Sequence, residues 1–274
     1  MQRSILITGC SSGIGLDAAR TMKQRGWRVI ATARKLDDLE RLRRIERVEV
    51  LPLELTDPAS IATCAISALD MTGGKLGAIF NNAAFGQPGA VEDLTPAVLR
   101  EQLEVNVVGA HDLTRRIIPA MRRNGVGRIV QCSSVLGFVA APYRGAYCAS
   151  KFALEALSIA MRGELEGSGI SVSIIEPGPI RSRFVETAVA RMRSHIDMEA
   201  SPHREKYRDR LASMDAGGKA AFKLEPEAVT KRLIHALEST RPRRRYYVTT
   251  PTYIAAAAQR LLPGFANEYF AKKF

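Results

Sequence analysis

The segment AYCASKFALEAL, residues 146–157, places Tyr147 four residues before Lys151. Residues four apart lie on the same face of a helix, so a phenol and an ammonium would face each other there. A free tyrosine has a pKa of about 10 and is a poor base at neutral pH. A neighbouring ammonium stabilises the phenolate and would lower that pKa, which suits a group that gives and takes protons. An isolated pair of this kind is usually a surface contact, so other features of the chain must choose between the two interpretations.

A glycine-rich loop, TGCSSGIG, follows the first expected strand and precedes a helix. Its glycines and hydroxyls are Gly9, Gly13, Gly15, Ser11 and Ser12. Glycines at this spacing permit a tight turn and a close approach of the backbone to a ligand. Because the loop opens a helix, its free N–H groups and the positive end of the helix dipole face an anion. Strand, loop and helix in this order predict a dinucleotide-binding loop rather than a plain connector.

The end of the second expected strand, ATARK, indicates which dinucleotide. An acidic residue there would bind the ribose hydroxyls of NAD, whereas an arginine accommodates the 2′-phosphate of NADP. The chain has no carboxylate at this point but has Arg34 followed by Lys35. A planar guanidinium suits phosphate, so the sequence favours NADP(H) over NAD(H). The alternative is that Arg34 merely starts a solvated loop.

Strand and helix patterns alternate along the chain. The expected strands are 4–7, 28–32, 48–53, 76–80, 127–132, 170–175 and 245–249. The expected helices are 14–25, 36–46, 58–70, 95–123, 146–167 and 226–239. Repeated strand–helix–strand units need crossover connections, which predicts one doubly wound α/β domain over residues 1–274 with a seven-stranded parallel sheet. Ligands of such sheets bind beyond the C-terminal ends of the strands.

Two segments depart from this alternation. Residues 180–225 contain no strand candidate and read as helical, and their place just past a strand end predicts a substrate lid. Several large apolar side chains would suit an apolar ligand, or would form the lid's own core: Phe184, Met192, Met198, Met214 and Phe222. Residues 251–274 predict one more helix followed by an aromatic segment, FANEYF, that docks or associates.

Composition limits the class of protein. The chain carries 40 Lys+Arg against 28 Asp+Glu, a net charge of +12, but the excess is scattered and is interpreted as solvated helix faces, not a nucleic-acid surface. Four cysteines without CxxC spacing predict free thiols in a reducing compartment and no metal site. The apolar run YIAAAA (253–258) is far shorter than the ~20 residues of a spanning helix, and no signal-peptide pattern is visible. We therefore expect a cytoplasmic protein, with peripheral membrane contact through residues 251–274 left open.

Six spaced motifs together resemble the short-chain dehydrogenase/reductase family. In chain order they are TGCSSGIG, NNAA (81–84), Asn106 in VNVVG, SS (133–134), YCASK (147–151) and PGPI (177–180). Three further stretches, FGQPGAVEDLT (85–95), EPGPIRSRF (176–184) and the arginine-rich last strand, resemble the 17β-hydroxysteroid dehydrogenase and retinol dehydrogenase-like branch. The resemblance covers essentially the whole chain and implies an NADP-dependent oxidoreductase with a Rossmann fold.

The resemblance also implies a catalytic set. Tyr147 would be the acid/base, Lys151 its activator, Ser134 the group that orients the substrate oxygen, and Asn106 the residue that holds a water through its backbone. The family spacing puts the serine thirteen residues before the tyrosine, which selects Ser134 over Ser133. Alternation along a strand sends those two serines to opposite faces.

Cofactor contacts follow from the same resemblance. They are Gly9, Ser11, Ser12, Gly13, Ile14, Gly15, Arg34, Lys35, Glu54, Asn81, Ala83, Tyr147, Lys151, Pro177, Gly178, Ile180 and Ser182. Asn81 and Ala83 would border the ribose, while Pro177, Gly178 and Ile180 would line the nicotinamide. Many relatives have an Asp that contacts adenine after the third strand, where this chain offers Glu54 in LELTD, so the adenine contact stays open. NNAA also replaces the commoner NNAG.

The implied reaction transfers hydride between nicotinamide and a carbonyl or alcohol of a lipophilic substrate, such as a retinoid, a steroid or a fatty aldehyde. A 3-oxoacyl-thioester reductase stays open, because a positive surface would attract an acidic carrier. So does a non-catalytic NADP-responsive binding protein, although a sensor has no need of the Ser134–Tyr147–Lys151 set. A homodimer or homotetramer is expected, paired through the helices at 95–123 and 146–167. The sequence does not give the physiological substrate, the direction of reaction or its stereochemistry.

Overall fold

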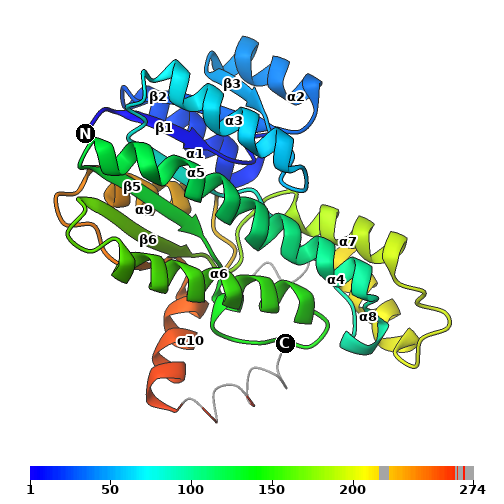
Figure 1. Ribbon diagram of the computed structural model, residues 1–274. Coiled ribbons are helices and arrows are strands. Elements are labelled where there is room, and N and C mark those ends of the chain that lie inside the picture. The colour runs from blue at the N-terminus through cyan, green and yellow to red at the C-terminus, as the bar shows by residue number, and fades with distance from the viewer. Residues whose placement is uncertain (216–221, 263, 265–267, 269–274) are drawn as a thin grey trace.

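The computed structural model describes residues 1–215, 222–262, 264 and 268, except for the side chains of residues 214 and 215. Its centre is a parallel sheet with the strand order β3-β2-β1-β4-β5-β6-β7 (Figure 1). The strands are β1 (Ser4–Ile7), β2 (Arg28–Ala33), β3 (Glu49–Pro52), β4 (Ala78–Asn81), β5 (Gly127–Cys132), β6 (Ile170–Glu176) and β7 (Arg245–Tyr247). This order confirms the predicted doubly wound, seven-stranded Rossmann fold.

The strand order reverses at β1. Ile5 of β1 pairs with Val29 of β2 on one side and with Ala78 of β4 on the other. Chain connections leave this point in opposite directions, which opens a crevice beyond the C-terminal ends of β1 and β4. The glycine-rich loop follows β1 directly and therefore lies in that crevice.

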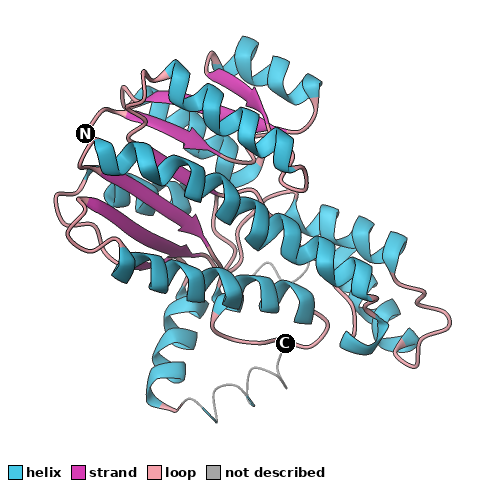
Figure 2. Ribbon diagram, in the orientation of Figure 1, coloured by secondary structure: helices cyan, strands magenta, loops and turns pink. Residues whose placement is uncertain are grey.

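Helices cover both faces of the sheet (Figure 2). Those between the strands are α1 (Gly13–Gln24), α2 (Leu36–Arg41), α3 (Pro58–Met71), α4 (Pro96–Leu103), α5 (Ala110–Arg123), α6 (Gly145–Glu164) and α9 (Glu227–Glu238). Local sequence explains two helix starts. Asp57 before α3 and Thr95 before α4 each accept a hydrogen bond from a first-turn N–H, and proline occupies the next position in both.

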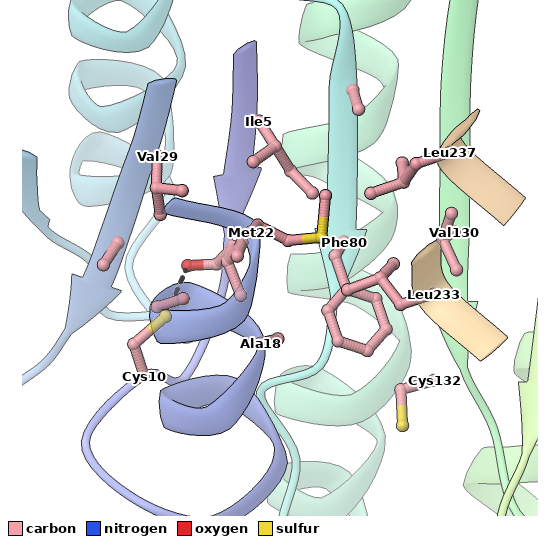
Figure 3. Packing of buried hydrophobic residues seen from close by; sticks show 14 of the residues in the cluster. Ile5, Cys10, Ala18, Met22, Val29, Phe80, Val130, Cys132, Leu233 and Leu237 are labelled. Atoms are coloured by element: carbon pink, nitrogen blue, oxygen red, sulfur yellow. Dashed lines mark hydrogen bonds between the residues drawn. The ribbon is translucent and has the colours of Figure 1, made fainter. Parts of the chain in front are cut away.

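Alternating side chains of the strands build two cores. Ile5 and Ile7 of β1 pack with Met22 of α1 and Leu233 of α9 on one face of the sheet, where Figure 3 shows Met22 and Leu233 on either side of Phe80. Leu6 points to the other face, which α3, α5 and α6 cover. Both faces of the sheet are thus apolar, as a parallel sheet buried between helices requires.

The sequence predicts one continuous helix over 95–123, and this prediction is wrong. The π-helical segment η3 (Glu104–Gly109) separates α4 from α5, and a second π-helical segment, η1 (Leu42–Glu46), follows α2. At the end of η3, a Cβ on Gly109 would lie 2.2 Å from the Leu55 carbonyl oxygen. The wide turn therefore brings the backbone of this segment against the loop after β3, a contact that helical periodicity does not reveal.

The segment 180–225 contains two helices, α7 (Phe184–His195) and α8 (Arg204–Asp215), and Ile180 pairs with Leu224 in a parallel bridge at its base. With α4, these helices project together at one end of the sheet (Figure 1). Strand β7 ends earlier than expected because Thr249 already precedes α10 (Thr250–Leu261). Within the FANEYF segment, all residues except Glu268 lie outside the described residues.

All four cysteines are free and buried. None of the helices within the described part of the chain is both long and apolar enough to cross a bilayer.

Candidate active site

The predicted catalytic residues come from neighbouring strand ends and one helix. Beyond the ends of β5 and β6, Ser133 N donates to Ile175 O and Val135 N donates to Pro177 O, each at 2.8 Å. These bonds continue the strand pairing into the two loops, so the serine loop and the Pro177–Gly178 loop form one surface. Helix α6 begins beside it and carries Tyr147 in its first turn.

Tyr147 and Lys151 face each other on α6. Lys151 Nζ lies 5.7 Å from the centroid of the Tyr147 ring and donates to Cys132 O at 2.8 Å. The lysine is only 3% exposed, whereas Tyr147 is half-buried beneath Phe184 with ring centroids 5.3 Å apart. The ammonium is thus fixed against the end of β5, and the phenol lies between it and the helical segment 180–225.

The sequence predicts that Lys151 lowers the pKa of Tyr147. This prediction is wrong for the surrounding protein groups alone, because together they do not lower that pKa. Burial raises the pKa of Tyr147 above its ordinary value, and the nearby Ser134 hydroxyl only partly opposes this. Burial likewise lowers the pKa of Lys151. Burial destabilises the phenolate form of Tyr147 more than these neighbours stabilise it, so Tyr147 is protonated at neutral pH.

The two serines separate as alternation predicts. Ser134 Oγ accepts a hydrogen bond from Leu136 N at 3.1 Å, which begins the short helix η4 (Val135–Gly137), and its hydroxyl lies beside Tyr147. Ser133 turns the other way, toward Glu155 of α6. Ser134 is therefore the serine that shares a surface with Tyr147.

Asn106 lies buried in the π-helical segment η3. Its Oδ1 accepts from Phe85 N at 3.1 Å, and its Nδ2 donates to Phe85 O at 2.9 Å and to Ser150 Oγ at 3.0 Å. The side chain is therefore committed to the loop after β4 and to α6. Only the backbone of Asn106 is left for the water that the family resemblance implies.

The glycine-rich loop is closely packed, and this explains its residue types. Gly9 has φ +72°, and a Cβ there would lie 2.8 Å from Ala83 Cα. A Cβ on Gly15 would lie 2.2 Å from Gly9 O, and one on Gly13 would lie 2.9 Å from Ser182 Cβ. The predicted contacts Ala83 and Ser182 are thus brought against the loop, while Ile14 and Ile180 pack against the core below it.

Helix α1 starts at this loop with a site that suits an anion. Ser12 is its N-cap residue, and the Ser12 side chain makes no capping hydrogen bond. The first-turn N–H groups of α1 therefore stay available to a phosphate, aided by the helix dipole. A cleft of about 710 Å³ opens here, lined in part by Ser11, Ser12, Gly13, Arg41, Ser182 and Arg183. These donors fit the diphosphate of a dinucleotide.

Two cations at this cleft were not singled out from the sequence. Arg41 Nη2 donates to Ser11 O at 2.5 Å, and Arg183 Nη2 donates to the same oxygen at 3.4 Å. Arg41 is the last residue of α2, seven residues after Arg34, and this closeness along the chain could have indicated it. No local sequence pattern indicates that Arg183 reaches this cleft, because Arg183 lies far along the chain, in the segment after β6.

Arg34 and Lys35 are exposed after β2, and the Arg34 side chain is 71% exposed. Arg34 pairs with Glu54, with 3.9 Å between Arg34 Nη1 and Glu54 Oε2. Glu54 Oε1 also accepts from Thr56 N at 3.1 Å, within its own turn. An exposed pair at that distance is weak, so Arg34 can exchange Glu54 for a phosphate.

Asn81 Nδ2 donates to Thr114 Oγ1 of α5 at 2.7 Å, so its amide is held against α5, and a contact between Asn81 and the ribose stays a prediction. The next residue, Asn82, was missed: its Nδ2 donates to Thr8 O at 2.9 Å and to Gly9 O at 3.2 Å. Asn82 therefore holds the glycine-rich loop against β4.

The loop after β6 is fixed from the C-terminal side. A Cβ on Gly178 would lie 2.1 Å from Thr249 Oγ1, so the backbone passes directly over the threonine that precedes α10. Pro177 is held through its carbonyl by Val135 N. The residues predicted to line the nicotinamide thus sit on a rigid support.

The large apolar residues of segment 180–225 divide between two roles. Phe184 covers Tyr147, whereas Met192 and Met198 pack with Ala90, Ile196 and Tyr207 in the segment's own core. Phe222 is exposed. The side chain of Met214 lies outside the described residues.

Tyr207 ties this segment to the loop after β4. Ala90 N donates to Tyr207 OH at 2.7 Å, and Tyr207 OH donates to Asp93.

A Rossmann crevice with a buried tyrosine–lysine pair at its mouth defines a dinucleotide-dependent oxidoreductase. A family model described as short chain dehydrogenase matches residues 3–193, and the chain belongs to this family.

The chain is similar over most of its length to several known proteins. It is 45% identical over 264 residues to an uncharacterized oxidoreductase, YbbO, of Escherichia coli, covering 96% of this chain and 92% of that one. It is 32% identical to human 17-beta-hydroxysteroid dehydrogenase type 1, covering 94% and 80%, and 30% identical to human retinol dehydrogenase 8, covering 88% and 79%. The resemblance to that branch of the family is thereby confirmed.

Solved structures agree with the fold. A short-chain dehydrogenase from Streptomyces avermitilis superposes with a TM-score of 0.78 at 27% identity, covering 96% of this chain and 95% of that one. Two family members from Burkholderia, at 21% and 24% identity, have TM-scores of 0.76 and 0.79; one was solved with NADP and the other with NAD. The shared fold accepts either dinucleotide.

Proposed function

We propose that the protein is an NADP(H)-dependent oxidoreductase that acts on a carbonyl or alcohol group of a lipophilic substrate. The observation that carries the proposal is the convergence of Ser134, Tyr147 and Lys151 at the C-terminal edge of the sheet. A serine hydroxyl, a phenol and an ammonium in this arrangement act together when a substrate oxygen lies between the serine and the tyrosine. A non-catalytic binding protein would not need this arrangement.

The chemistry of the site follows from the protonation states. A bound nicotinamide supplies or accepts the hydride. In the direction of reduction, Tyr147 starts protonated and donates its phenolic proton to the substrate oxygen. Ser134 donates a hydrogen bond to the same oxygen, so that developing negative charge meets fixed donors. Lys151, held by Cys132 O, stabilises the phenolate that remains.

The preference for NADP rests on charge. Arg34 follows β2 where a carboxylate would select NAD, and Arg41 at the end of α2 adds a second cation. The preference for a lipophilic substrate rests on the relatives named for hydroxysteroids and retinol, and on the aromatic ring of Phe184 over Tyr147.

A homodimer or homotetramer in a reducing, cytoplasmic environment is part of this proposal. Four free, buried thiols suit such an environment. Apolar side chains on the outer face of α6 support association between subunits, as do those of η3.

The test is a substrate panel followed by NADPH and NADH absorbance. The panel holds a fatty aldehyde, a retinal, a steroid ketone and a 3-oxoacyl group presented both free and on its carrier. We expect turnover of at least one lipophilic carbonyl, faster with NADPH than with NADH. Turnover of the carrier-linked ketone alone would replace the proposal by the thioester reductase, and no turnover with any compound would favour a binding protein.

A further inference from the structure

A buried cluster of charged side chains lies behind the Tyr147–Lys151 pair. Glu155 follows Lys151 by one turn of α6, Glu176 is the last residue of β6, and Arg245 is the first residue of β7. Glu155 is 5% exposed and Glu176 is 0% exposed. The reaction proposed above uses none of these three residues, and a buried carboxylate is costly unless it is paired.

One guanidinium serves both carboxyl groups. Arg245 Nη2 lies 2.9 Å from Glu155 Oε2, and Arg245 Nη1 donates to Glu176 Oε1. Two ionised carboxylates would therefore share one directly bonded guanidinium, while Lys151 and Arg162 of α6 act on them through space. The geometry favours a cluster with a single net negative charge on the two acids, balanced by Arg245.

The remaining oxygens show where a proton would lie. Glu176 Oε2 is buried and finds no hydrogen-bond donor among the described residues, while Glu155 faces the Ser133 hydroxyl. The two carboxyl groups nevertheless lie within hydrogen-bonding reach of each other. Two carboxylates cannot bond because both only accept, whereas one protonated carboxyl becomes a donor to the other. A shared proton thus supplies the donor that the cluster lacks.

The electrostatics point the same way. Burial, followed by the charge of Glu155, raises the pKa of Glu176 to about 8, and Arg245 opposes this only in part. Burial also raises the pKa of Glu155. The charged and titratable groups that face the two acids are Lys151 and Arg162 of α6, Arg244 before β7, and Arg245 and Tyr247 of β7.

The cluster is connected to the catalytic residues. A Cβ on Gly137 would lie 2.5 Å from Ser133 Oγ and 3.2 Å from Glu155 Oε1, so these two atoms converge above Gly137. Lys151 holds the preceding residue of the same loop through Cys132 O. Glu176 directly precedes Pro177. The acids therefore join the serine loop, helix α6 and the loop expected to line the nicotinamide.

We propose that Glu155 and Glu176 hold one proton between them over Arg245, and that this pair positions Lys151 and the Ser134 loop against the cofactor loop. The positioning role rests on the proposed function, whereas the shared proton does not. Loss of the proton adds a second negative charge to the cluster, one helical turn from Lys151. That charge raises the pKa of the lysine and disturbs the packing that the two acids share.

Infrared spectroscopy tests the proton directly, through the C=O stretch of a protonated carboxylic acid. The wild-type protein should show this band at neutral pH and lose it with a midpoint near pH 8. Glu176→Gln should remove the band, because its amide replaces the shared proton as a donor and Glu155 is then ionised against Arg245. Glu166→Gln, at an exposed position, should leave the band unchanged. A wild type without the band, or a Glu176→Gln variant that retains it, would overturn the proposal.

Unfolding in urea provides a second readout that needs no turnover. The pKa of Glu176 is raised in the fold from 4.5 to about 8, so its neutral form contributes stability that is fully present below pH 4.5. That contribution declines as the pH rises and is lost by about pH 8. The stability of wild type relative to Glu176→Gln should therefore fall over this window. A rise or a flat difference would mean that both acids are ionised throughout.

The positioning role has its own measurement, the pH profile of kcat/KM with the best substrate of the panel. The wild type should show an inflection near pH 8 that Glu176→Gln lacks and Glu166→Gln keeps. An inflection that persists in Glu176→Gln would refute the positioning role, even if the infrared band confirms the proton. An inactive wild type would refute the proposed function and the positioning role with it, while the infrared and urea results would still decide the shared proton.

Discussion

Burial affects the pKa values of the proposed catalytic residues, Tyr147 and Lys151, more than charge pairing does. Tyr147 and Lys151 sit one turn apart on α6, and desolvation pushes both toward their neutral forms. The phenol is consequently a better proton donor than acceptor in the protein by itself. In the proposed reduction, Tyr147 therefore starts as the proton donor.

Replacing Tyr147 by Phe removes the proton and keeps the ring against Phe184. We expect kcat to fall by at least about a hundredfold, the usual contribution of a general acid. Binding of NADPH, measured by calorimetry, should change little because the phenyl ring preserves the packing. Turnover close to the wild-type rate would show that another group donates the proton.

Replacing Arg34 by Ala tests the choice of dinucleotide. Loss of a charge-assisted contact with the 2′-phosphate should weaken NADPH by about ten- to a hundredfold. NADH lacks that phosphate, so its dissociation constant should stay nearly the same. Equal losses for the two cofactors, measured by fluorescence titration, would mean that Arg34 does not contact the phosphate.

The elements around the cofactor crevice depend on close backbone contacts. Gly9 is packed against Ala83, Gly15 against Gly9 O, and Gly109 against Leu55 O. The contacts of Gly9 and Gly109 join separate segments, and that of Gly15 closes the glycine-rich loop on itself; a side chain at any of the three would force the two parts apart. Local geometry in this part of the molecule therefore needs glycine for space, and at Gly9 also for a positive φ.

Replacing Gly15 by Ala should damage the loop, because the new Cβ would meet a backbone oxygen that cannot move aside. We expect a loss of about 1–3 kcal/mol in unfolding free energy together with weaker dinucleotide binding. Gly163→Ala is the matched control, since a Cβ there meets nothing within 4 Å on the same kind of element. It should be neutral or should stabilise helix α6 by up to about 1 kcal/mol. Similar unfolding midpoints for the two variants would contradict the packing argument.

At the scale of the whole molecule, helix α6 has an apolar outer face that the rest of the described chain does not cover. Phe152 is 42% exposed and Ile159 is 48% exposed, and their spacing of seven places both on one side of the helix. Val108 of η3 is exposed nearby in the same helical layer. A surface of this kind is expected to be covered by a second subunit.

Light scattering on a sizing column tests the association. The wild type should have the mass of a dimer or tetramer, and the double variant Phe152→Lys, Ile159→Lys should shift toward the monomer because it places charge in the contact. Ile66→Lys changes an even more exposed apolar residue, on α3, and should leave the mass unaltered. A monomeric wild type would dispose of the association, and a variant that stays assembled would place the contact elsewhere.

The amino-acid sequence alone determined the alternating strands and helices, the glycine-rich loop and the Tyr147–Lys151 spacing, because periodicity and short motifs are local properties of a chain. Only the tertiary structure decided that Asn81 faces Thr114, that Arg183 reaches Ser11 across 172 residues, and that Arg245 joins Glu155 to Glu176. Those contacts depend on which strand ends the crossovers bring together. The pKa of Tyr147 depends likewise on how much water the fold removes, and no spacing along the chain encodes that.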